Sequence, residues 1–357
     1  MNETSRAFLE RLLGTPGPSG HEAAAAAVWR AEAASFADAV DGDISGNSLA
    51  TLNGAGAPRV MLAGHIDEIG FMVTHVDEDG FLYFDGVGGW DPQVVVGQRI
   101  VLLTRKGHVR GVVGKKPIHL IKDEEKKKAA KLTELWIDIG ATGRDDATER
   151  GVRVGDAAVI DAPLLDLGNG RIASRSIDNR IGAFIVLEAL RRLADGPAPA
   201  ASVTAVATTQ EEIGHFGGGA RTSAYRLEPQ VAIVVDVTFA TDAPGLEKKE
   251  LGEHKLGGGP VLARGSAANA LVFERLDEVA EREGIAHSIT ASPRYTSTDA
   301  DAIYLTRAGV ATGLVAVPNR YMHSPNEIVA LDDLDAAADL IAAFCRDLTV
   351  EDDFAPR

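Results

Sequence analysis

Apolar positions along the chain repeat at two spacings, one typical of helices and the other of strands. Near the start, apolar residues from Phe8 to Leu13 recur on one face of a predicted helix, which ends at the breaker-rich loop 14–20. Further on, short and nearly continuous apolar runs predict strands of a sheet that is covered on both faces. The other helical patterns lie at 22–39, 181–193, 269–283, 299–308 and 331–348, and the strand-like runs at 60–63, 203–207, 231–235 and 312–317.

The order of these elements predicts the fold class. Strands alternate with helices along most of the chain, which is typical of an α/β protein. Residues 76–161 differ, because short strand-like pieces such as 81–84 and 99–103 are separated by glycine turns. We therefore predict an α/β fold, with a mixed-sheet α/β/α sandwich built from residues 1–75 and 162–357 and a small barrel-like β-rich domain inserted between them.

Composition restricts the partners that the chain can have. Its 357 residues, 45% of them hydrophobic, are enough for one large core and a smaller accessory domain. There are 52 acidic and 36 basic side chains, and the net charge of -16 would repel nucleic acid phosphates and anionic membranes. Acidic residues interrupt the lysines of the run 122–131, which favours a solvated face over a binding patch. We expect neither nucleic acid nor a membrane as a partner.

The single cysteine, Cys345, lies in an apolar helical stretch and has no partner for an internal disulfide, so a buried thiol is expected. No uncharged apolar run approaches about 18 residues, and the first residues lack a basic segment followed by an apolar one. The cytoplasm is the expected location, because it is a reducing compartment.

Candidate ligands follow the predicted strands, at the edge where open α/β sheets form their sites. His65 and Asp67 come directly after the run 60–63. Side chains two apart in an extended segment point the same way, so Asp67 could orient His65 toward a metal. Glu211 and Glu212 follow another strand, and two adjacent carboxylates at a buried edge repel each other unless a cation or proton intervenes. One of them could bind metal while the other acts as a general base.

Three further residues have a similar setting. Asp178 precedes the helical pattern at 181–193 and could be an ordinary N-cap. Asp236 ends the run 231–235, and His323 follows the last strand. Each fits an ordinary loop residue when taken alone, but their coincidence at one sheet edge favours a site. Two histidines and three carboxylates, with one glutamate to spare, suit two divalent ions that share a bridging carboxylate, with zinc, cobalt or manganese as candidates.

Five short segments together form a specific pattern: Gly64-His65-Ile66-Asp67-Glu68, Ser176-Ile177-Asp178-Asn179-Arg180, Glu211-Glu212-Ile213-Gly214, Val235-Asp236-Val237-Thr238 and Tyr321-Met322-His323-Ser324-Pro325. With this pattern the sequence resembles the M42 metallopeptidases, the tetrahedral or TET aminopeptidases, over essentially its whole length. The resemblance implies a zinc-exopeptidase-like sandwich and a dinuclear aminopeptidase that removes N-terminal residues from short peptides. It also implies two divalent ions per subunit, with zinc first among them, and a homo-oligomer, a dodecamer built from dimers.

The resemblance also implies a role for each of the five expected metal ligands. Asp178 would bridge the two metals, and His65 and Asp236 would each bind a different one. Glu212 and His323 would complete the two coordination spheres.

Two residues outside the ligand set take catalytic roles by the same resemblance. Glu211 would be the general base for the water activated between the two metals, and Asp67 would orient His65. The inserted segment would serve dimerisation. The stretch 295–300 keeps the Thr-Asp-Ala element of the family's substrate side, but the residues before it are less typical, so the preferred N-terminal residue stays open.

Other functions fit parts of the same pattern. A related two-metal carboxypeptidase or deacylase would place a substrate carboxylate or acyl group where an aminopeptidase places the amine. Glu211 and Glu212 could suggest a glycoside hydrolase, which needs a carboxyl pair and no transition metal. A self-assembling shell in which metals only stabilise the fold is the alternative that is not an enzyme. The net charge of -16 is a hint against acidic peptides as substrates.

Overall fold

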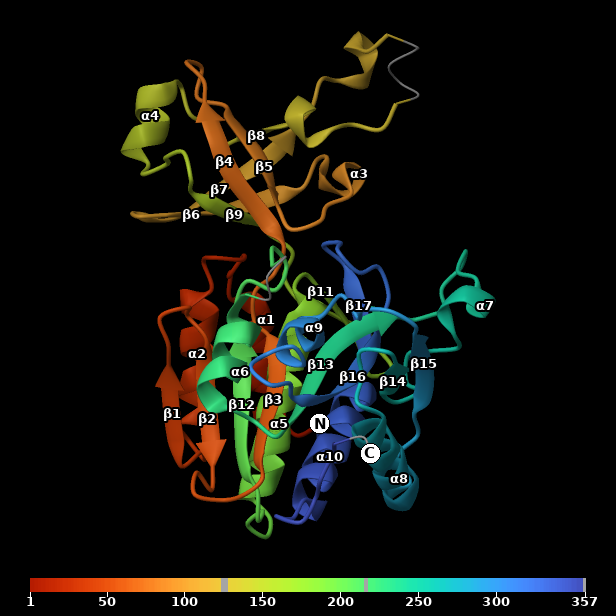
Figure 1. Ribbon diagram of the computed structural model, residues 1–357. Coiled ribbons are helices and arrows are strands. Elements are labelled where there is room, and N and C mark those ends of the chain that lie inside the picture. The colour runs from red at the N-terminus through yellow and green to blue at the C-terminus, as the bar shows by residue number, and fades with distance from the viewer. Residues whose placement is uncertain (123–127, 215–217, 356–357) are drawn as a thin grey trace.

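Helices and strands alternate along most of the chain, as the apolar pattern predicts (Figure 1). This computed structural model describes residues 1–122, 128–214 and 218–355. The helices are α1 (Glu3–Gly14), α2 (Ala23–Ala33), α3 (Pro92–Val95), α4 (Arg144–Glu149), α5 (Ile177–Ala194), α6 (Gly218–Leu227), α7 (Lys248–Leu251), α8 (Ala270–Glu283), α9 (Asp299–Ile303) and α10 (Leu331–Asp347), with the 3-10 turns η1 (Ile118–Leu120) and η2 (Leu132–Glu134). The strands are β1 (Ala39–Gly42), β2 (Ser48–Leu52), β3 (Arg59–His65), β4 (Gly70–Val76), β5 (Leu82–Val87), β6 (Arg99–Thr104), β7 (Gly107–Gly114), β8 (Trp136–Asp138), β9 (Ala157–Ile160), β10 (Leu165–Gly168), β11 (Arg171–Ser174), β12 (Ser202–Thr208), β13 (Val231–Phe239), β14 (Val261–Gly265), β15 (Ser288–Ser292), β16 (Ala311–Asn319) and β17 (Glu327–Ala330).

The centre of the larger unit is an eight-stranded mixed sheet in the order β1-β2-β12-β3-β13-β16-β14-β15. Its four middle strands, β12, β3, β13 and β16, run parallel, and nearly all of their residues are buried. Burial on both faces explains their continuous apolar sequences, since a strand with one solvated face would alternate. The predicted mixed sheet is therefore confirmed.

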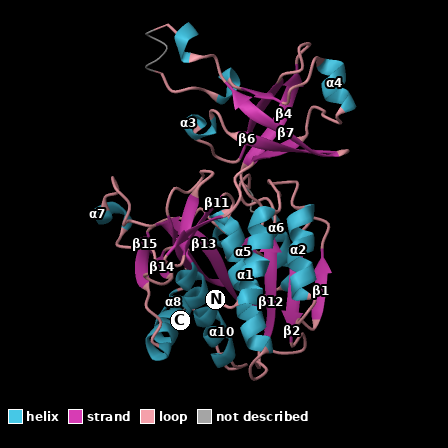
Figure 2. Ribbon diagram, turned by 180° about the vertical axis from the view of Figure 1, so that it is seen from behind, coloured by secondary structure: helices cyan, strands magenta, loops and turns pink. Residues whose placement is uncertain are grey.

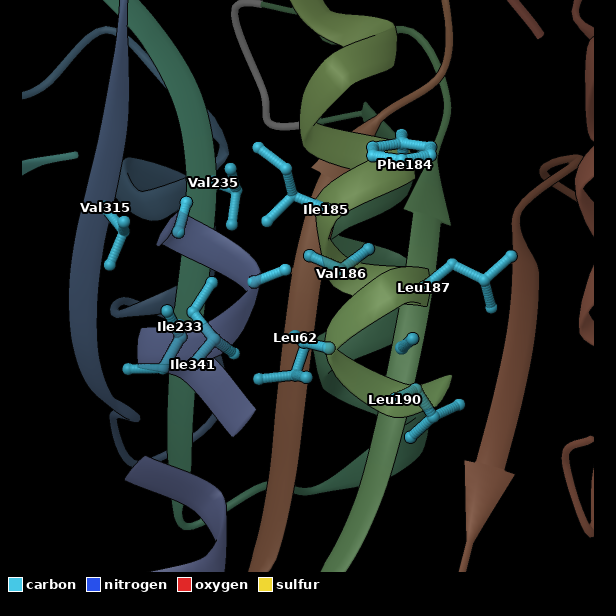
Figure 3. Close-up of a cluster of buried hydrophobic side chains, with 14 of the residues drawn as sticks. Leu62, Phe184, Ile185, Val186, Leu187, Leu190, Ile233, Val235, Val315 and Ile341 are labelled. Carbon is cyan, nitrogen blue, oxygen red and sulfur yellow. The ribbon is translucent and has the colours of Figure 1, made fainter. Parts of the chain in front are cut away.

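Helices cover both faces of this sheet, which confirms the three-layer sandwich (Figure 2). Alternate residues of β3 point to opposite faces, so Leu62 packs with α5 and α10 while Met61 packs with α6 and α9. Figure 3 shows the larger core, where Phe184 and Leu187 of α5 and Ile341 of α10 lie over the middle strands. Helices α1, α2 and α8 extend the same layer.

Helix α5 approaches β3 so closely that no side chain fits between them. A Cβ on Gly64 would lie 2.3 Å from the carbonyl carbon of Gly182, so position 64 needs a residue without a side chain. This approach brings His65, the last residue of β3, close to Asp178 in the first turn of α5.

Six antiparallel strands, in the order β4-β5-β8-β7-β6-β9, close into a small barrel with its own apolar core (Figure 1). The barrel begins at Gly70, where β4 pairs with β5 and β9, and it ends at Ile160. The insertion predicted from the sequence, 76–161, begins at the last residue of β4 and so assigns this strand to the larger unit. In the structure, β4 is hydrogen-bonded to strands of the barrel. Sequence could not separate it, because β4 follows β3 through a short link and shares its apolar character.

Two predicted helices end earlier than expected. The pattern at 22–39 becomes α2 only as far as Ala33, because the chain from Ala39 pairs with β2 as strand β1. The pattern at 299–308 becomes the short helix α9, which ends at Ile303. Its continuation is prevented by Arg307, whose φ of 57° is left-handed and incompatible with a right-handed helix.

Two smaller predictions concern single segments. Cys345 is a free and fully buried thiol, as predicted, and burial raises its pKa to about 12. Residues 123–127, half of the lysine-rich run 122–131, lie outside the described residues. Within the described residues, no helix is long and apolar enough to cross a membrane.

Candidate metal centre and active site

The carboxyl ends of the parallel strands bring the predicted residues to one place. His65 ends β3, Asp236 lies in β13, and β12 leads directly into the loop that carries Glu211 and Glu212. Because these strands are neighbours in the sheet and run parallel, their carboxyl ends meet at the same edge. The structure thus gathers side chains that lie far apart in the sequence.

His65 is held between Asp67 and the carboxylates of the cluster. Its Nδ1 atom lies 3.4 Å from Oδ1 of Asp67 and 3.3 Å from the Asp67 carbonyl oxygen. The other nitrogen, Nε2, lies 3.2 Å from Oδ1 of Asp178, 3.7 Å from Oε2 of Glu211 and 3.9 Å from Oδ1 of Asp236. Asp67 therefore holds the imidazole at Nδ1, and Nε2 points toward a group of carboxylate oxygens.

His323 faces the same cluster from the opposite side. Its Nε2 atom lies 3.4 Å from Oδ2 of Asp178 and 3.4 Å from Oε2 of Glu212, while Nδ1 lies 2.8 Å from the carbonyl oxygen of Gly89. Asp178 thus turns one oxygen toward each histidine, since its Oδ1 faces His65. This is the placement that a bridging carboxylate between two ions requires.

Asp67 also fixes the loop that carries the two glutamates. It is fully buried, and its carboxylate accepts hydrogen bonds from the backbone N–H groups of Glu211 at 3.2 Å and Glu212 at 3.1 Å. The hydroxyl of Ser19 donates to the same carboxylate. Asp67 therefore links His65 and the two glutamates without facing the centre of the cluster.

The electrostatics of the cluster are those of crowded carboxylates. Burial raises the pKa of Glu211 to about 10, with a contribution from Asp236, and burial together with Asp178 raises that of Asp236 to about 8. Burial and Asp178 likewise raise the pKa of Glu212 well above its ordinary value. Burial alone would lower the pKa of His65, but the charge of Glu211 and the hydrogen bond to Asp178 raise it well above normal. Crowding of this kind is relieved by added positive charge.

The donor set fits divalent metal ions. Two groups of three side chains could each hold an ion, because the ligand atoms inside each group lie within 4.8 Å of one another. One group is His65, Asp178 and Glu212, and the other is His65, Glu211 and Asp236. Oε1 of Glu212 is buried and has no hydrogen-bond partner among the described residues, which is costly for a carboxylate oxygen unless a cation contacts it. Imidazole and carboxylate ligands suit zinc and its neighbours among the divalent ions.

Three further buried carboxyl groups lie next to the cluster, and two of them, Glu327 and Glu22, were not predicted as part of a site. Glu327 accepts hydrogen bonds from the backbone N–H of Asp178 at 2.9 Å and of His323 at 2.8 Å. Glu22 accepts from the backbone of the glutamate loop, and burial raises its pKa. The third, Asp299, belongs to the Thr-Asp-Ala element expected on the substrate side; it accepts from the hydroxyl of Thr208, and burial raises its pKa to about 6. The only sequence signal for Glu327 was its position a few residues after His323.

The cluster lies at one end of a cavity of about 930 Å³. This volume is in the range of clefts that hold small ligands or short peptide ends. Apolar and exposed side chains line part of its wall, among them Ile213, Phe239, Tyr295 and Leu305. The predicted ligands and Glu211 are thus accessible from a cleft large enough for a substrate.

Comparisons with known proteins identify the family of this chain. The sequence profile of the family described as M42 glutamyl aminopeptidase matches residues 46–340. A lysyl aminopeptidase from Pyrococcus furiosus is 36% identical over 98% of this chain and 99% of its own length. The crystal structure of a TET aminopeptidase from Thaumarchaeota archaeon SCGC AB-539-E09 has a TM-score of 0.93 at 35% identity and covers 98% of both chains. The Pyrococcus horikoshii TET1 peptidase has a TM-score of 0.84 at 32% identity, over 96% of this chain and 100% of its own.

The three-layer fold, the barrel and the clustered ligands, together with these relatives, define a peptidase of the aminopeptidase kind. The chain belongs to the M42 peptidase family, whose members depend on metal. The resemblance found in the sequence is therefore confirmed.

Proposed function

We propose that the protein is a dinuclear metalloaminopeptidase that removes N-terminal residues from short peptides. The observation that carries this proposal is Asp178, which lies between His65 and His323 with one oxygen facing each. Glu211 lies beside this arrangement and belongs to the wall of the cavity. Two ligand sets that share Asp178, with Glu211 beside them as a separate carboxylate, suit the hydrolysis of a peptide bond by water.

The ligands divide into two sets around Asp178. The distances favour a different division from the one that the resemblance implies, in which His65 and Asp236 bind different metals. Nε2 of His65 lies 3.9 Å from Oδ1 of Asp236, so these two would hold one ion. Nε2 of His323 lies 3.4 Å from Oε2 of Glu212, so these two would hold the other, with Asp178 shared between the ions. When bound, the two cations supply positive charge that polarises the scissile carbonyl and acidifies the attacking water. Zinc is the first candidate, and cobalt and manganese remain compatible with the same ligands.

Glu211 would act as the general base. It would take a proton from the attacking water and return it to the leaving amine when the peptide bond breaks. Burial and the neighbouring Asp236 raise the pKa of Glu211, and positive charge held in the cluster would favour the ionised form that accepts this proton. Asp67 would hold His65 in the orientation that turns Nε2 inward.

The proposal extends to assembly and location. The TET1 peptidase assembles into a tetrahedron or an octahedral shell, and a dodecamer has been solved. We propose that this chain forms a dodecamer built from dimers, with the barrel as the dimerisation domain. Exposed apolar side chains on the barrel, including Val112, Ile118 and Leu120, support this role. The free buried thiol of Cys345 is compatible with the cytoplasm as the proposed location.

The experiment compares free and blocked substrates. Metal-stripped protein is reloaded in turn with zinc, cobalt and manganese and assayed with aminoacyl-p-nitroanilides and their N-acetylated forms. We expect cleavage of the free-amine substrates only, and only after reloading. Equal cleavage of the N-acetylated forms would favour a deacylase, and activity that resists chelation would contradict the metal mechanism.

A further inference from the structure

His323 lies in a tight loop between β16 and β17, and burial does little to fix its position. Its side chain is 35% exposed, whereas that of His65 is 2% exposed. Tyr321 and His323 have φ angles of 62° and 58°, a left-handed conformation that is unfavourable for residues with a side chain. At the base of the loop, Arg320 and Ile328 exchange two backbone hydrogen bonds of 3.0 Å. The loop therefore depends on specific contacts, more than on burial, to keep this conformation.

Arg320 also extends its side chain to a carboxylate on another segment. Its Nη2 atom lies 2.7 Å from Oδ2 of Asp242, and its Nε atom lies 3.1 Å from Oδ1, so the guanidinium binds both carboxylate oxygens. The backbone N–H of Leu256 donates to Oδ2 at 3.3 Å. Burial alone would raise the pKa of Asp242, but the hydrogen bond and the charge of Arg320 lower it, so the carboxylate is ionised at neutral pH. Both side chains are partly buried, which reduces the screening of the pair by solvent.

This ion pair continues the alignment of two strands beyond their ends. Strands β13 and β16 run parallel and pair as far as Phe239 and Asn319. Asp242 follows β13, which carries Asp236, and Arg320 directly follows β16. The pair therefore ties the chain after one ligand-bearing strand to the start of the loop that carries the second histidine.

We propose that the ion pair between Asp242 and Arg320 positions His323 for metal binding, and that it thereby controls the affinity for the ion held by His323 and Glu212. The inference rests on the proposed function, in which this ion and a second one share Asp178. Arg320 begins the loop, so fixing its guanidinium fixes the backbone from which the histidine extends. Asp242 and Arg320 are positioning residues, and neither side chain belongs to the cavity wall.

The other proposed ion does not depend on this pair. His65 is buried at the end of β3, and Asp67 holds its Nδ1 atom. Asp236 lies within β13, before the strand ends, and is also buried. Loss of the ion pair should therefore weaken one metal affinity and leave the other close to the wild-type value.

The test measures zinc binding instead of peptidase turnover. Metal-stripped protein is titrated with zinc against a chelator of known affinity, which gives the number of ions per subunit and an affinity for each. The wild-type protein is expected to bind two ions. In Arg320→Gln, one of the two affinities should fall by about tenfold, the lower end of the range for groups that orient metal ligands. The other affinity and the Tm of the metal-free protein should change little, because ion pairs that are partly exposed contribute little to stability.

Further variants separate the ion pair from its individual side chains. Asp242→Asn should produce the same selective loss, and the double variant should bind no more weakly than Arg320→Gln, because the two residues act as a unit. Arg320→Lys keeps the charge with fewer hydrogen bonds and should lose less. The matched control is Arg226→Gln, which breaks the exposed pair with Asp41 and should leave both affinities unchanged.

A variant without the histidine identifies which ion is affected. His323→Ala should itself weaken the ion held by His323 and Glu212, and Arg320→Gln added to it should have no further effect. An additional loss in this background, at the remaining ion, would contradict positioning through His323.

Three other results would overturn the inference. Unchanged zinc affinities in Arg320→Gln would show that the ion pair does not position His323, and the two-metal proposal would stand. Equal weakening of both ions, with a lower Tm of the metal-free protein, would show that the pair only supports the fold. If the wild-type protein binds fewer than two zinc ions per subunit, the proposed dinuclear centre fails and the inference fails with it.

Discussion

Glu327 is the residue through which the two sides of the candidate centre are connected. It is buried, and its two oxygens accept the backbone N–H groups of Asp178 and His323, one each. His323 has a φ of 58°, a left-handed conformation that is unfavourable for a residue with a side chain. The hydrogen bond to Glu327 stabilises this turn, so Glu327 positions two expected ligands without touching the space between them.

Replacement of Glu327 by glutamine should weaken metal binding. Glutamine offers one acceptor oxygen and one NH2 donor, so one of the two backbone N–H groups loses its partner. Changes to groups that orient metal ligands typically cost about 10- to 100-fold in affinity, and we expect a loss of that size. The measurement is competition for zinc with a chelator of known affinity. Glu283→Gln, an exposed position in α8, is the control, and an unchanged affinity of Glu327→Gln would contradict this role.

The sequence was sufficient to select the side chains that gather in the cluster, but not the groups that hold them. His65, Glu211 and Asp236 are recognisable because each is a polar residue beside a continuous apolar strand. The contacts of Glu327 with Asp178 and of Ser19 with Asp67 join residues that are distant in the sequence, and no local pattern reveals such contacts.

Elements were predictable where burial alone decides them. The four middle strands and helices α5, α8 and α10 follow from continuous or periodic apolar residues. Strands β1 and β15 were not predicted, because they lie at the edges of the sheet and depend on pairing with a neighbour. Dependence on strand pairing also explains why α2 is shorter than predicted. The residues that follow it pair with β2 as strand β1, and this pairing outweighs the helical preference of the alanine-rich segment.

A buried ion pair fixes the start of α5 against the rest of the sandwich. Arg180 is fully buried and donates to Glu68 at 2.9 Å, to the carbonyl oxygen of Ile66 at 3.1 Å and to that of Leu12 at 2.8 Å. Arg175 also pairs with Glu68. These contacts tie α1, the segment after β3 and the helix that carries Asp178 into one unit.

Removal of this arginine should destabilise the fold strongly. Arg180→Met leaves Glu68 with an incomplete partner set and removes the hydrogen bonds to the carbonyl oxygens of Ile66 and Leu12, a loss of about 3–5 kcal/mol by analogy with other broken buried pairs. Thermal unfolding with saturating metal should show a clear drop in Tm. Arg110→Met is the control, because its side chain is 84% exposed and should leave Tm nearly unchanged. An unchanged Tm for Arg180→Met would show that the pair contributes little.

At the scale of the whole molecule, the barrel and the sandwich meet at the active site. Nδ1 of His323, in the sandwich, donates a hydrogen bond to the carbonyl oxygen of Gly89, which lies in the loop after β5 of the barrel. The barrel therefore contributes to the orientation of an expected ligand in addition to its proposed role in assembly. Sequence indicated the existence of an inserted unit, but not this contact, which depends on how the two units pack.

The proposed assembly predicts a change in size when exposed apolar side chains of the inserted domain are replaced by charged ones. Ile118 and Leu120, in the turn η1 between β7 and β8, are 63% and 64% exposed, and their joint replacement by glutamate should dissociate the oligomer into smaller species. Light scattering after size-exclusion chromatography measures this directly. Ile44→Glu, an exposed position in the larger unit, should keep the wild-type mass. If the double variant also keeps that mass, this turn is not part of the interface.

The most direct test of the central claim is turnover and metal content measured on the same samples of Glu211→Gln and wild-type protein. Glutamine keeps the shape of the side chain but cannot accept the proton of the attacking water. We predict that the variant retains two ions per subunit while kcat falls by about 100- to 10,000-fold, the range associated with a general base. A variant that binds metal normally and retains its turnover would contradict the account.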